Sequence, residues 1–86
     1  MIDISVKYTG LIRSKAVSSE EKWPVKEGAT LEELLAAVAS KYHVRLDDST
    51  KFIIVYNDHG IKFDRWPEQV LRNNDKVLIL PSISGG

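Results

Sequence analysis

The sequence predicts an α+β domain, in which a mixed sheet of four to five strands carries one main helix packed across it. Three observations predict this class. The chain opens with alternating apolar and polar residues, continues with one amphipathic helical segment, and ends in β-branched and aromatic runs. Its 86 residues are enough for one domain. We therefore expect a single domain over residues 1–86, with residues 82–86 as a flexible C-terminal tail.

The first predicted unit is an N-terminal hairpin. Residues 2–8 alternate strictly between apolar and polar side chains, a period that is typical of a half-buried strand. Residues 20–25 are expected to form a second strand that pairs with the first. Pro24 places this second strand at a sheet edge, because proline has no amide hydrogen to donate to a ladder.

The strongest local signal is a helix start at Thr30. Thr30 and Glu33 have the spacing of a capping box, in which each side chain bonds the other residue's backbone amide. Apolar residues then recur at helical spacing, and Lys41 lies near the end, where the helix dipole favours a cation. We expect a helix from about Leu31 to about Tyr42 with one apolar face.

The segment after the helix predicts two further strands. Residues 52–56 are β-branched and aromatic, which indicates a third strand. Residues 57–60 form a turn cluster, and residues 61–63 are expected to form a short fourth strand. An irregular stretch is expected from Trp66 to Leu71.

The final strand decides the predicted topology. A turn at residues 72–75 precedes an apolar run at residues 76–80, which Pro81 is expected to stop. Consecutive apolar positions indicate burial on both faces, and hence a central place in the sheet. The resulting element order is that of the β-grasp, or ubiquitin-like, fold. Its expected core is Ile4, Val6, Leu31, Leu34, Leu35, Val38, Ile54, Val77 and Ile79.

Composition argues against several function classes. The chain has no cysteine, so thiol nucleophiles, disulfides and cysteine-based metal sites are excluded. Its 12 Lys and Arg balance 12 Asp and Glu, whereas a nucleic-acid binder needs excess positive charge. The apolar runs are too short to span a membrane, and the first residues do not look like a signal peptide. We expect a cytoplasmic protein whose partners are neither nucleic acid nor membrane.

The usual catalytic residue sets are not recognisable in the sequence. His43 and His59 are far apart and are interpreted as surface residues. Trp23 and Trp66 are interpreted as core or rim packing, with anchoring of a partner as the alternative. We expect the chain to be a carrier or protein co-substrate with no catalytic residues of its own, no metal and no bound cofactor.

The C-terminal Gly85-Gly86 is the feature that suggests chemistry. Glycine has no Cβ, so the last peptide units can extend through a channel too narrow for side chains. The carboxylate of Gly86 could then reach an active site in another protein. There, ATP could convert it to an acyl-adenylate, and a sulfur donor could displace AMP to leave a thiocarboxylate. Taken alone, the dipeptide is equally compatible with a frayed chain end.

Residues 71–86 combine a leucine, the turn Asn73-Asn74-Asp75, an apolar strand, Pro81 and the terminal Gly-Gly. This pattern resembles the C-terminal signature of the small subunit of molybdopterin synthase. Asn57 matches an asparagine common in that family. The thiazole-forming sulfur carrier and the ubiquitin-related modifier share its fold and Gly-Gly end. Two departures are the absence of the glycine usual in the turn and Ser82 where a second proline is frequent.

The resemblance implies two protein partners. A ubiquitin-activating-type adenylyltransferase would charge Gly86 using ATP and magnesium. A sulfur-accepting synthase subunit would then receive the sulfur, with molybdopterin (molybdenum or tungsten cofactor) biosynthesis ranked first.

Docking and threading residues follow from the same hypothesis. If Val77 and Ile79 face the helix, Leu78 and Leu80 lie on the opposite face of the sheet, where apolar side chains usually mark a partner site. The predicted docking residues are Leu78, Leu80 and Pro81, with Ile83, Ser84 and Gly85 threading the tail toward its target.

Three alternatives stay open at this point. The Gly86 adenylate could pass to a lysine, as in ubiquitin-like protein modifiers. The sulfur could serve thiamine, tRNA or cysteine synthesis. The chain could also be a non-covalent β-grasp interaction module with an idle tail. The sequence does not separate modification from sulfur transfer, because both use the same tail.

Overall fold

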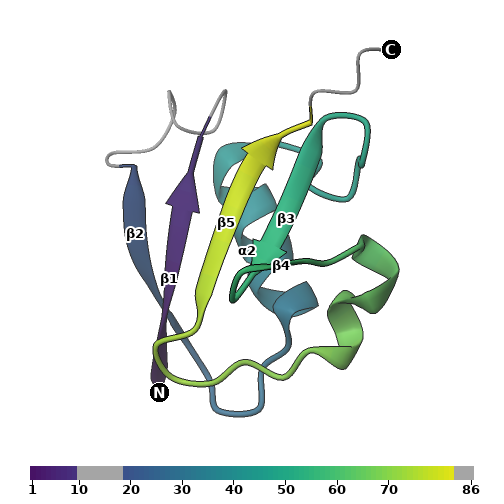
Figure 1. The fold of residues 1–86 in the computed structure, drawn as a ribbon. Helices are drawn as coiled ribbons and strands as arrows, with labels where there is room; N and C mark the ends of the chain where they lie inside the picture. The colour runs from purple at the N-terminus through teal and green to yellow at the C-terminus, as the bar shows by residue number, and fades with distance from the viewer. Residues whose placement is uncertain (10–18, 83–86) are drawn as a thin grey trace.

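The structure is a computed structural model that describes residues 1–9 and 19–82. Its elements follow one another in the predicted order (Figure 1). They are β1 (Ile2–Tyr8), β2 (Glu20–Val25), α2 (Leu31–Tyr42), β3 (Phe52–Tyr56), β4 (His59–Gly60), the 3-10 helix η1 (Phe63–Glu68) and β5 (Lys76–Pro81).

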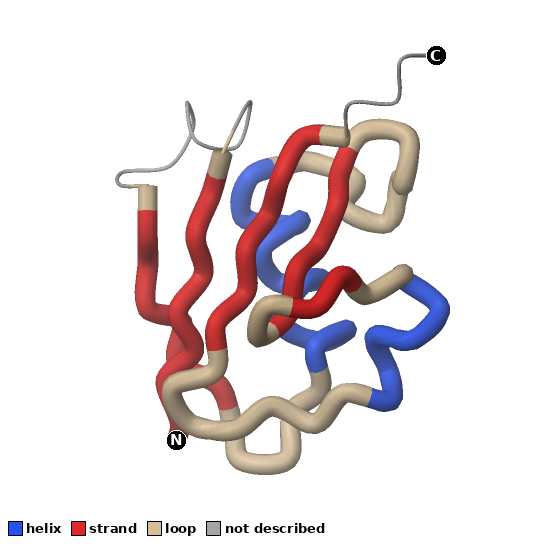
Figure 2. The backbone as a smooth tube through the Cα atoms, in the orientation of Figure 1, coloured by secondary structure: helices blue, strands red, loops and turns tan. Residues whose placement is uncertain are grey.

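The strands form one mixed sheet in the order β2-β1-β5-β3-β4. β1 and β5 run parallel, and the other neighbours are antiparallel. Helix α2 lies across one face of the sheet (Figures 1 and 2). The predicted fold class, a β-grasp sheet with one main helix, is therefore confirmed, as are the central position of β5 and the edge position of β2 with Pro24.

The core lies between the sheet and α2. The nine predicted core residues are all buried, each at most 3% exposed. They come from alternate positions of the three central strands and from the apolar face of the helix, as the two periodicities require. The structure adds Tyr8, Ala29, Tyr42, Leu46, Phe52, Trp66 and Leu71 to this core.

Both ends of α2 have a local cause. Thr30 Oγ1 accepts a hydrogen bond from the Glu33 amide at 3.3 Å, which confirms the Thr30 half of the predicted capping box. At the other end His43 adopts a left-handed conformation with φ of 56°, which ends the helix after Tyr42. No helix among residues 1–9 and 19–82 is long and apolar enough to cross a membrane.

The prediction of a fourth strand at residues 61–63 is wrong. β4 comprises His59 and Gly60, which lie opposite Tyr56 and Val55. The turn needs only two residues, because Asn57 and Asp58 both adopt positive φ, 48° and 71°. Asn and Asp tolerate this conformation better than other side chains, and it gives the tight turn preferred in hairpins.

Two further boundaries differ from the prediction. The stretch expected to be irregular from Trp66 begins inside η1, a 3-10 helix that runs from Phe63 to Glu68. Pro81 belongs to β5, where it lies opposite Phe52, although it was expected to stop the strand. The fixed φ of proline is compatible with extended backbone, so the ladder can reach one residue further.

Candidate functional site

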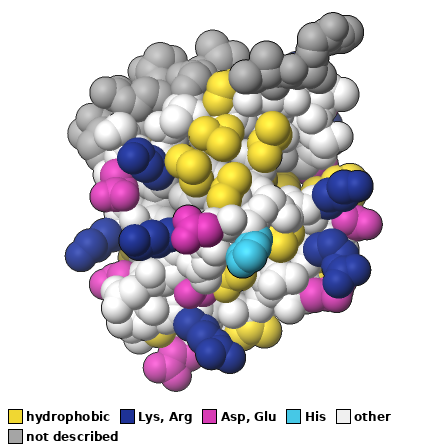
Figure 3. Space-filling view, viewed as in Figure 1, with side chains coloured by type: hydrophobic (Ala, Val, Ile, Leu, Met, Phe, Trp, Pro, Cys, Tyr) yellow, Lys and Arg dark blue, Asp and Glu magenta, His cyan; other side chains and the backbone are white. Residues whose placement is uncertain are grey.

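The face of the sheet turned away from α2 carries an apolar patch over β3 and β5. In the strand register Leu80 lies opposite Ile53, and Leu78 lies opposite Val55. We call Ile53, Val55, Leu78 and Leu80 the outer apolar patch; hydrophobic side chains gather on this face in Figure 3. Ile53 is 43% exposed and the other three are half-buried.

The alternation of side chains along β5 explains why the patch lies on the face without the helix. Val77 and Ile79 are buried against the helix side, so the intervening Leu78 and Leu80 point to the opposite face, as predicted. The rest of this face is different, because β1 and β2 present charged side chains such as Lys7 and Lys22. Among residues 1–9 and 19–82, the apolar surface of this face therefore lies over β3 and β5.

The end of β5 is held at the border of this patch. The Ser82 amide donates to the Lys51 carbonyl at 2.8 Å, directly after Pro81 pairs with Phe52. The predicted threading residues Ile83, Ser84 and Gly85, and the predicted reactive residue Gly86, lie outside the described residues. Four residues span at most about 14 Å when fully extended.

The start of β5 is fixed by a hydrogen-bonded turn. The Asp75 carboxylate accepts from Tyr56 Oη at 2.5 Å, Asn57 Nδ2 at 3.0 Å and the Arg72 amide at 2.8 Å. Partial burial opposes ionisation of Asp75, but these hydrogen bonds outweigh it and lower its pKa. Burial and the bond to Asp75 raise the pKa of Tyr56 to about 12. Asn57 Oδ1 also accepts a hydrogen bond from the Lys76 amide at 2.8 Å, which gives Asn57 a structural role.

The turn before β5 contains no glycine, and the conformation of Asn74 explains why none is needed. Asn74 adopts a φ of 72°, the left-handed conformation that glycine supplies at no steric cost. Asparagine is among the side chains that tolerate it. The turn also ties the start of β1, because the Asn74 amide donates to the Asp3 carbonyl and the Asp3 amide donates to Asn73 Oδ1, both at 2.8 Å.

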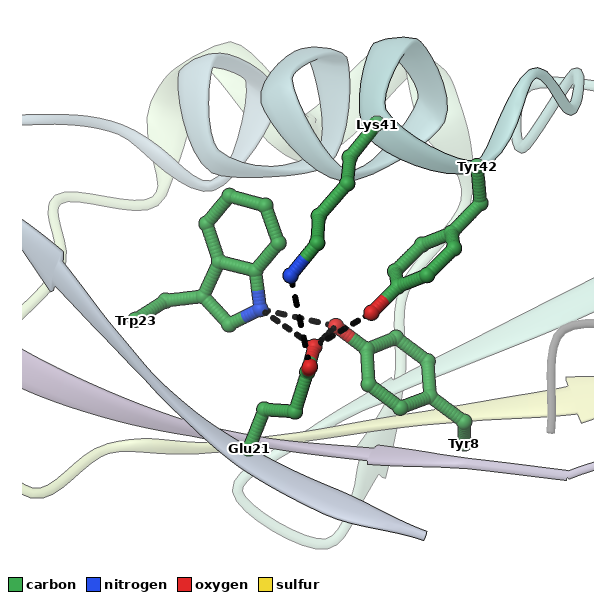
Figure 4. Close-up of polar contacts among 5 residues, drawn as sticks. All are labelled: Tyr8, Glu21, Trp23, Lys41 and Tyr42. Atoms are coloured by element: carbon green, nitrogen blue, oxygen red, sulfur yellow. Dashed lines mark hydrogen bonds and ion pairs between the residues drawn. The ribbon is translucent and has the colours of Figure 1, made fainter. Parts of the chain in front are cut away.

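A polar cluster on the helix side was not found from the sequence. We define it as Tyr8, Glu21, Trp23, Lys41 and Tyr42, which converge in Figure 4. The Glu21 carboxylate accepts from the hydroxyls of Tyr8 and Tyr42 at 2.7 Å each, and from Lys41 Nζ at 3.3 Å. Trp23 Nε1 donates to Tyr8 Oη at 2.7 Å. The cluster joins β1, β2 and the last turn of α2.

The electrostatics of this cluster favour an anionic Glu21. Burial opposes its ionisation, but hydrogen bonds from Tyr42, Tyr8 and Lys41 outweigh that effect and lower its pKa. Burial and the bond to Glu21 raise the pKa of Tyr8 well above its ordinary value. Nothing in the sequence pointed to this cluster, because only the register of β1 with β2 brings Glu21 opposite the buried Val6.

The other residues considered from the sequence have ordinary positions. His43 and His59 are both exposed, as expected. Trp66 is buried in the core at 7% exposure, and Trp23 is half-buried at its rim. These positions confirm the packing interpretation of both tryptophans.

With this geometry in place, comparison with known families is decisive. The model of the ThiS family matches residues 6–86 of the chain. The chain belongs to the ThiS family. A comparison with curated proteins gives no match.

Solved structures similar to this ThiS-family chain share its fold over nearly its whole length. The putative molybdopterin converting factor, subunit 1, from Pyrococcus furiosus is 21% identical, with a TM-score of 0.75 over 96% of this chain and 100% of its own. Small archaeal modifier protein 1 from Methanosarcina acetivorans is 23% identical, with a TM-score of 0.72 over 100% of this chain and 98% of its own. The protein of that name from Haloferax volcanii is 16% identical, with a TM-score of 0.71 over 98% and 99%.

These comparisons confirm the resemblance drawn from residues 71–86. At these identities the solved structures establish the β-grasp fold alone. Together with the family match, they show that the chain is a ThiS-family member with the β-grasp fold.

Proposed function

We propose that this ThiS-family chain is a sulfur carrier whose working group is the Gly86 carboxylate. A ubiquitin-activating-type adenylyltransferase binds the chain and uses ATP and magnesium. The carboxylate oxygen attacks the α-phosphorus of ATP, and pyrophosphate leaves. Hydrosulfide from a sulfide-level sulfur donor then attacks the acyl carbon, the bond to AMP breaks, and loss of the sulfur-bound proton leaves a thiocarboxylate. The chain supplies no catalytic residue to these steps and acts as a protein co-substrate.

The observation that carries the proposal is where β5 ends. This central strand leaves the sheet at Pro81, beside the outer apolar patch, and Ser82 is still anchored to Lys51. The next residues in the sequence are Ile83, Ser84, Gly85 and Gly86. A partner seated on the patch would therefore receive a short tail whose base is held by the sheet.

The outer apolar patch fits the docking role proposed for Leu78 and Leu80. Both lie on the face without the helix, next to the exposed Pro81. A contiguous apolar surface rimmed by charged residues is typical of a protein–protein contact. Ile83, Ser84 and Gly85 then thread toward the partner's active site, where the absence of a side chain at Gly85 matters most.

We place the carrier in molybdopterin biosynthesis in the cytoplasm, with a sulfur-accepting synthase subunit as its second partner. The support is the C-terminal signature and the fold shared with a protein named as a molybdopterin converting factor subunit.

The test is a charging assay followed by intact-protein and peptide mass spectrometry. The chain is incubated with the adenylyltransferase, ATP, magnesium and a sulfide source. The C-terminal peptide should gain the mass of one sulfur replacing one oxygen, and intact mass should confirm Gly86 as the last residue. Deleting Gly86 should abolish this gain with little change in Tm. Gly85→Val should block charging, whereas the matched variant Ser84→Ala should not. A mass gain that survives deletion of Gly85-Gly86 would exclude Gly86 as the working group.

Protein modification is the second candidate. Two of the similar structures are small archaeal modifier proteins, and the same adenylate could be attacked by a lysine Nζ to give an isopeptide. Tryptic peptides whose lysine carries the branch left by residues 77–86 of this chain, recovered from cells with the wild-type chain and absent with the Gly86 deletion, would establish this activity.

A further inference from the structure

An apolar groove lies around the β4 edge of the sheet, next to the outer apolar patch. Its volume is about 560 Å³, and its apolar lining includes Phe52, Ile53, Ile61, Phe63 and Trp66. The short β4 leaves it open, because β4 pairs with only the last two residues of β3.

Two aromatic rings shape this groove. Phe63 is 55% exposed and meets Trp66 edge to face, with ring centroids 6.4 Å apart. Trp66 is itself buried, and its Nε1 donates to the Ile61 carbonyl at 3.3 Å. The wall behind Phe63 is therefore preorganised, which lowers the entropic cost of filling the groove.

The groove is continuous with the surface around the tail exit. Ile53 belongs both to the outer apolar patch and to the groove, and it lies opposite Leu80. Phe52 lines the groove and lies opposite Pro81. The tail beyond Ser82 reaches at most about 14 Å, so a protein that takes Gly86 must pack close to this point.

The size of a specific interface points the same way. A stable complex covers about 800 Å² on each partner, far more than the four side chains of the outer apolar patch can offer. Toward β1 and β2 the face is charged, with Lys7 and Lys22. The apolar surface that adjoins the patch continues past Ile53 into the groove.

We propose that the groove receives a bulky apolar side chain, aromatic or branched aliphatic, from the same protein that adenylates the tail. Phe63 is its central contact. This inference rests on the proposed carrier function, and it adds a specificity-determining contact remote from the reacting carboxylate. A side chain that fills such a preformed apolar pocket is the usual form of an interface hot spot.

The experiment measures Kd without ATP, and the concentration dependence of charging with ATP, using the purified adenylating protein that charges the wild-type chain. Phe63→Ser should raise Kd about tenfold. The chain concentration that gives half-maximal charging should rise by the same factor, while the maximal charging rate stays unchanged. Phe63→Leu should restore most of the affinity. Val70→Ser is the matched control, since Val70 is also 55% exposed but does not line the groove. Tm is measured for each variant to confirm folding.

Other occupants give different results. The effect of Phe63→Ser should persist in a chain lacking Gly85-Gly86; if it disappears there, the groove holds the chain's own tail and the proposal is overturned. A concentration-dependent dimer in sedimentation that Phe63→Ser abolishes would assign the groove to a second copy. Equal Kd values for Phe63→Ser and Val70→Ser, with normal charging, would reject the groove and keep the carrier function. A wild-type chain that no adenylating protein charges would reject both.

Discussion

The polar cluster and the outer apolar patch lie on opposite faces of the same sheet. The polar groups of the cluster are hydrogen-bonded within the fold, whereas the apolar side chains of the patch are partly exposed to water. In the polar cluster, the Glu21 carboxylate accepts several hydrogen bonds from side chains of β1, β2 and α2. Among residues 1–9 and 19–82, no buried side-chain nitrogen or oxygen lacks a hydrogen-bond partner. The outer apolar patch instead leaves side chains such as Ile53 in water.

This difference separates stability from function. A fully satisfied polar group stabilises the fold in which it is placed, and it offers little to a partner. An apolar patch in water gains free energy only when another surface covers it. Substitutions in the polar cluster should therefore lower the free energy of unfolding and leave partner affinity unchanged. Substitutions in the outer apolar patch should weaken partner binding and leave the free energy of unfolding nearly unchanged.

The largest effect on stability is expected for Glu21→Ala. The change removes the acceptor shared by Tyr8, Tyr42 and Lys41 and leaves donors partly buried without it. The free energy of unfolding should fall by about 2–4 kcal/mol, measured by urea denaturation. Glu21→Gln keeps one acceptor oxygen and should lose less. Partner affinity of the folded variant should match wild type; a loss of affinity would show that the cluster also supports docking.

Leu80→Asp should have the next largest effect, on binding rather than on folding. A carboxylate placed in the covered patch would be desolvated without a partner, so Kd for the adenylating protein should rise at least about tenfold. Lys22→Asp is the matched control, because it changes charge on the same face in the half away from the patch. If Leu80→Asp leaves Kd unchanged while the chain stays folded, or if Lys22→Asp weakens binding equally, the patch is not the docking surface.

Acidification should lower the stability of the fold progressively, through Glu21 of the polar cluster and Asp75 of the turn before β5. The pKa values of Glu21 and Asp75 are lowered by folding, so both carboxylates bind protons more weakly in the native state. Their contribution is present in full above their ordinary values and is lost as pH falls through the lowered ones. Thermal unfolding scanned downward from pH 6 should show Tm declining below about pH 4.5. Glu21→Gln should flatten this decline; an unchanged slope would show that other carboxylates cause it.

Much of the fold could be predicted from the sequence, because local signals and the global pattern agree. The alternation at residues 2–8 and the cap at Thr30 each had one simple interpretation, and both are confirmed. The consecutive apolar residues of β5 correctly predicted its central place in the sheet, but the expected burial on both faces is wrong, because Leu78 and Leu80 are only half-buried on the face without the helix. The position of β4 was missed because the turn takes two residues rather than four. That length depends on positive φ at both Asn57 and Asp58, which composition permits but does not require.

The site was predictable in part. The faces of Leu78 and Leu80 followed from period-two alternation once Val77 and Ile79 were assigned to the core. The polar cluster was not predictable, because it needs the register of β1 with β2 and the contact of both with the end of α2. Each of its residues taken alone looks like an ordinary surface or rim position. The groove behind Phe63 likewise depends on a 3-10 helix that the irregular sequence around Pro67 did not reveal.

Lys41→Met should have the smallest effect on stability. It tests whether the ion pair or the tyrosine hydrogen bonds stabilise the polar cluster. Lys41 pairs with Glu21 at 3.3 Å, but its side chain is 49% exposed, so water screens the pair. Methionine keeps the apolar stem, while the contact of Nζ over the rings of Trp23 and Tyr42, at 5.2 and 5.1 Å, is lost. The hydroxyls of Tyr8 and Tyr42 still donate to Glu21. The free energy of unfolding should therefore fall by less than about 1 kcal/mol, and the loss should shrink further in high salt. A loss as large as that of Glu21→Ala would mean that the ion pair, rather than the tyrosine hydroxyls, stabilises the partly buried carboxylate.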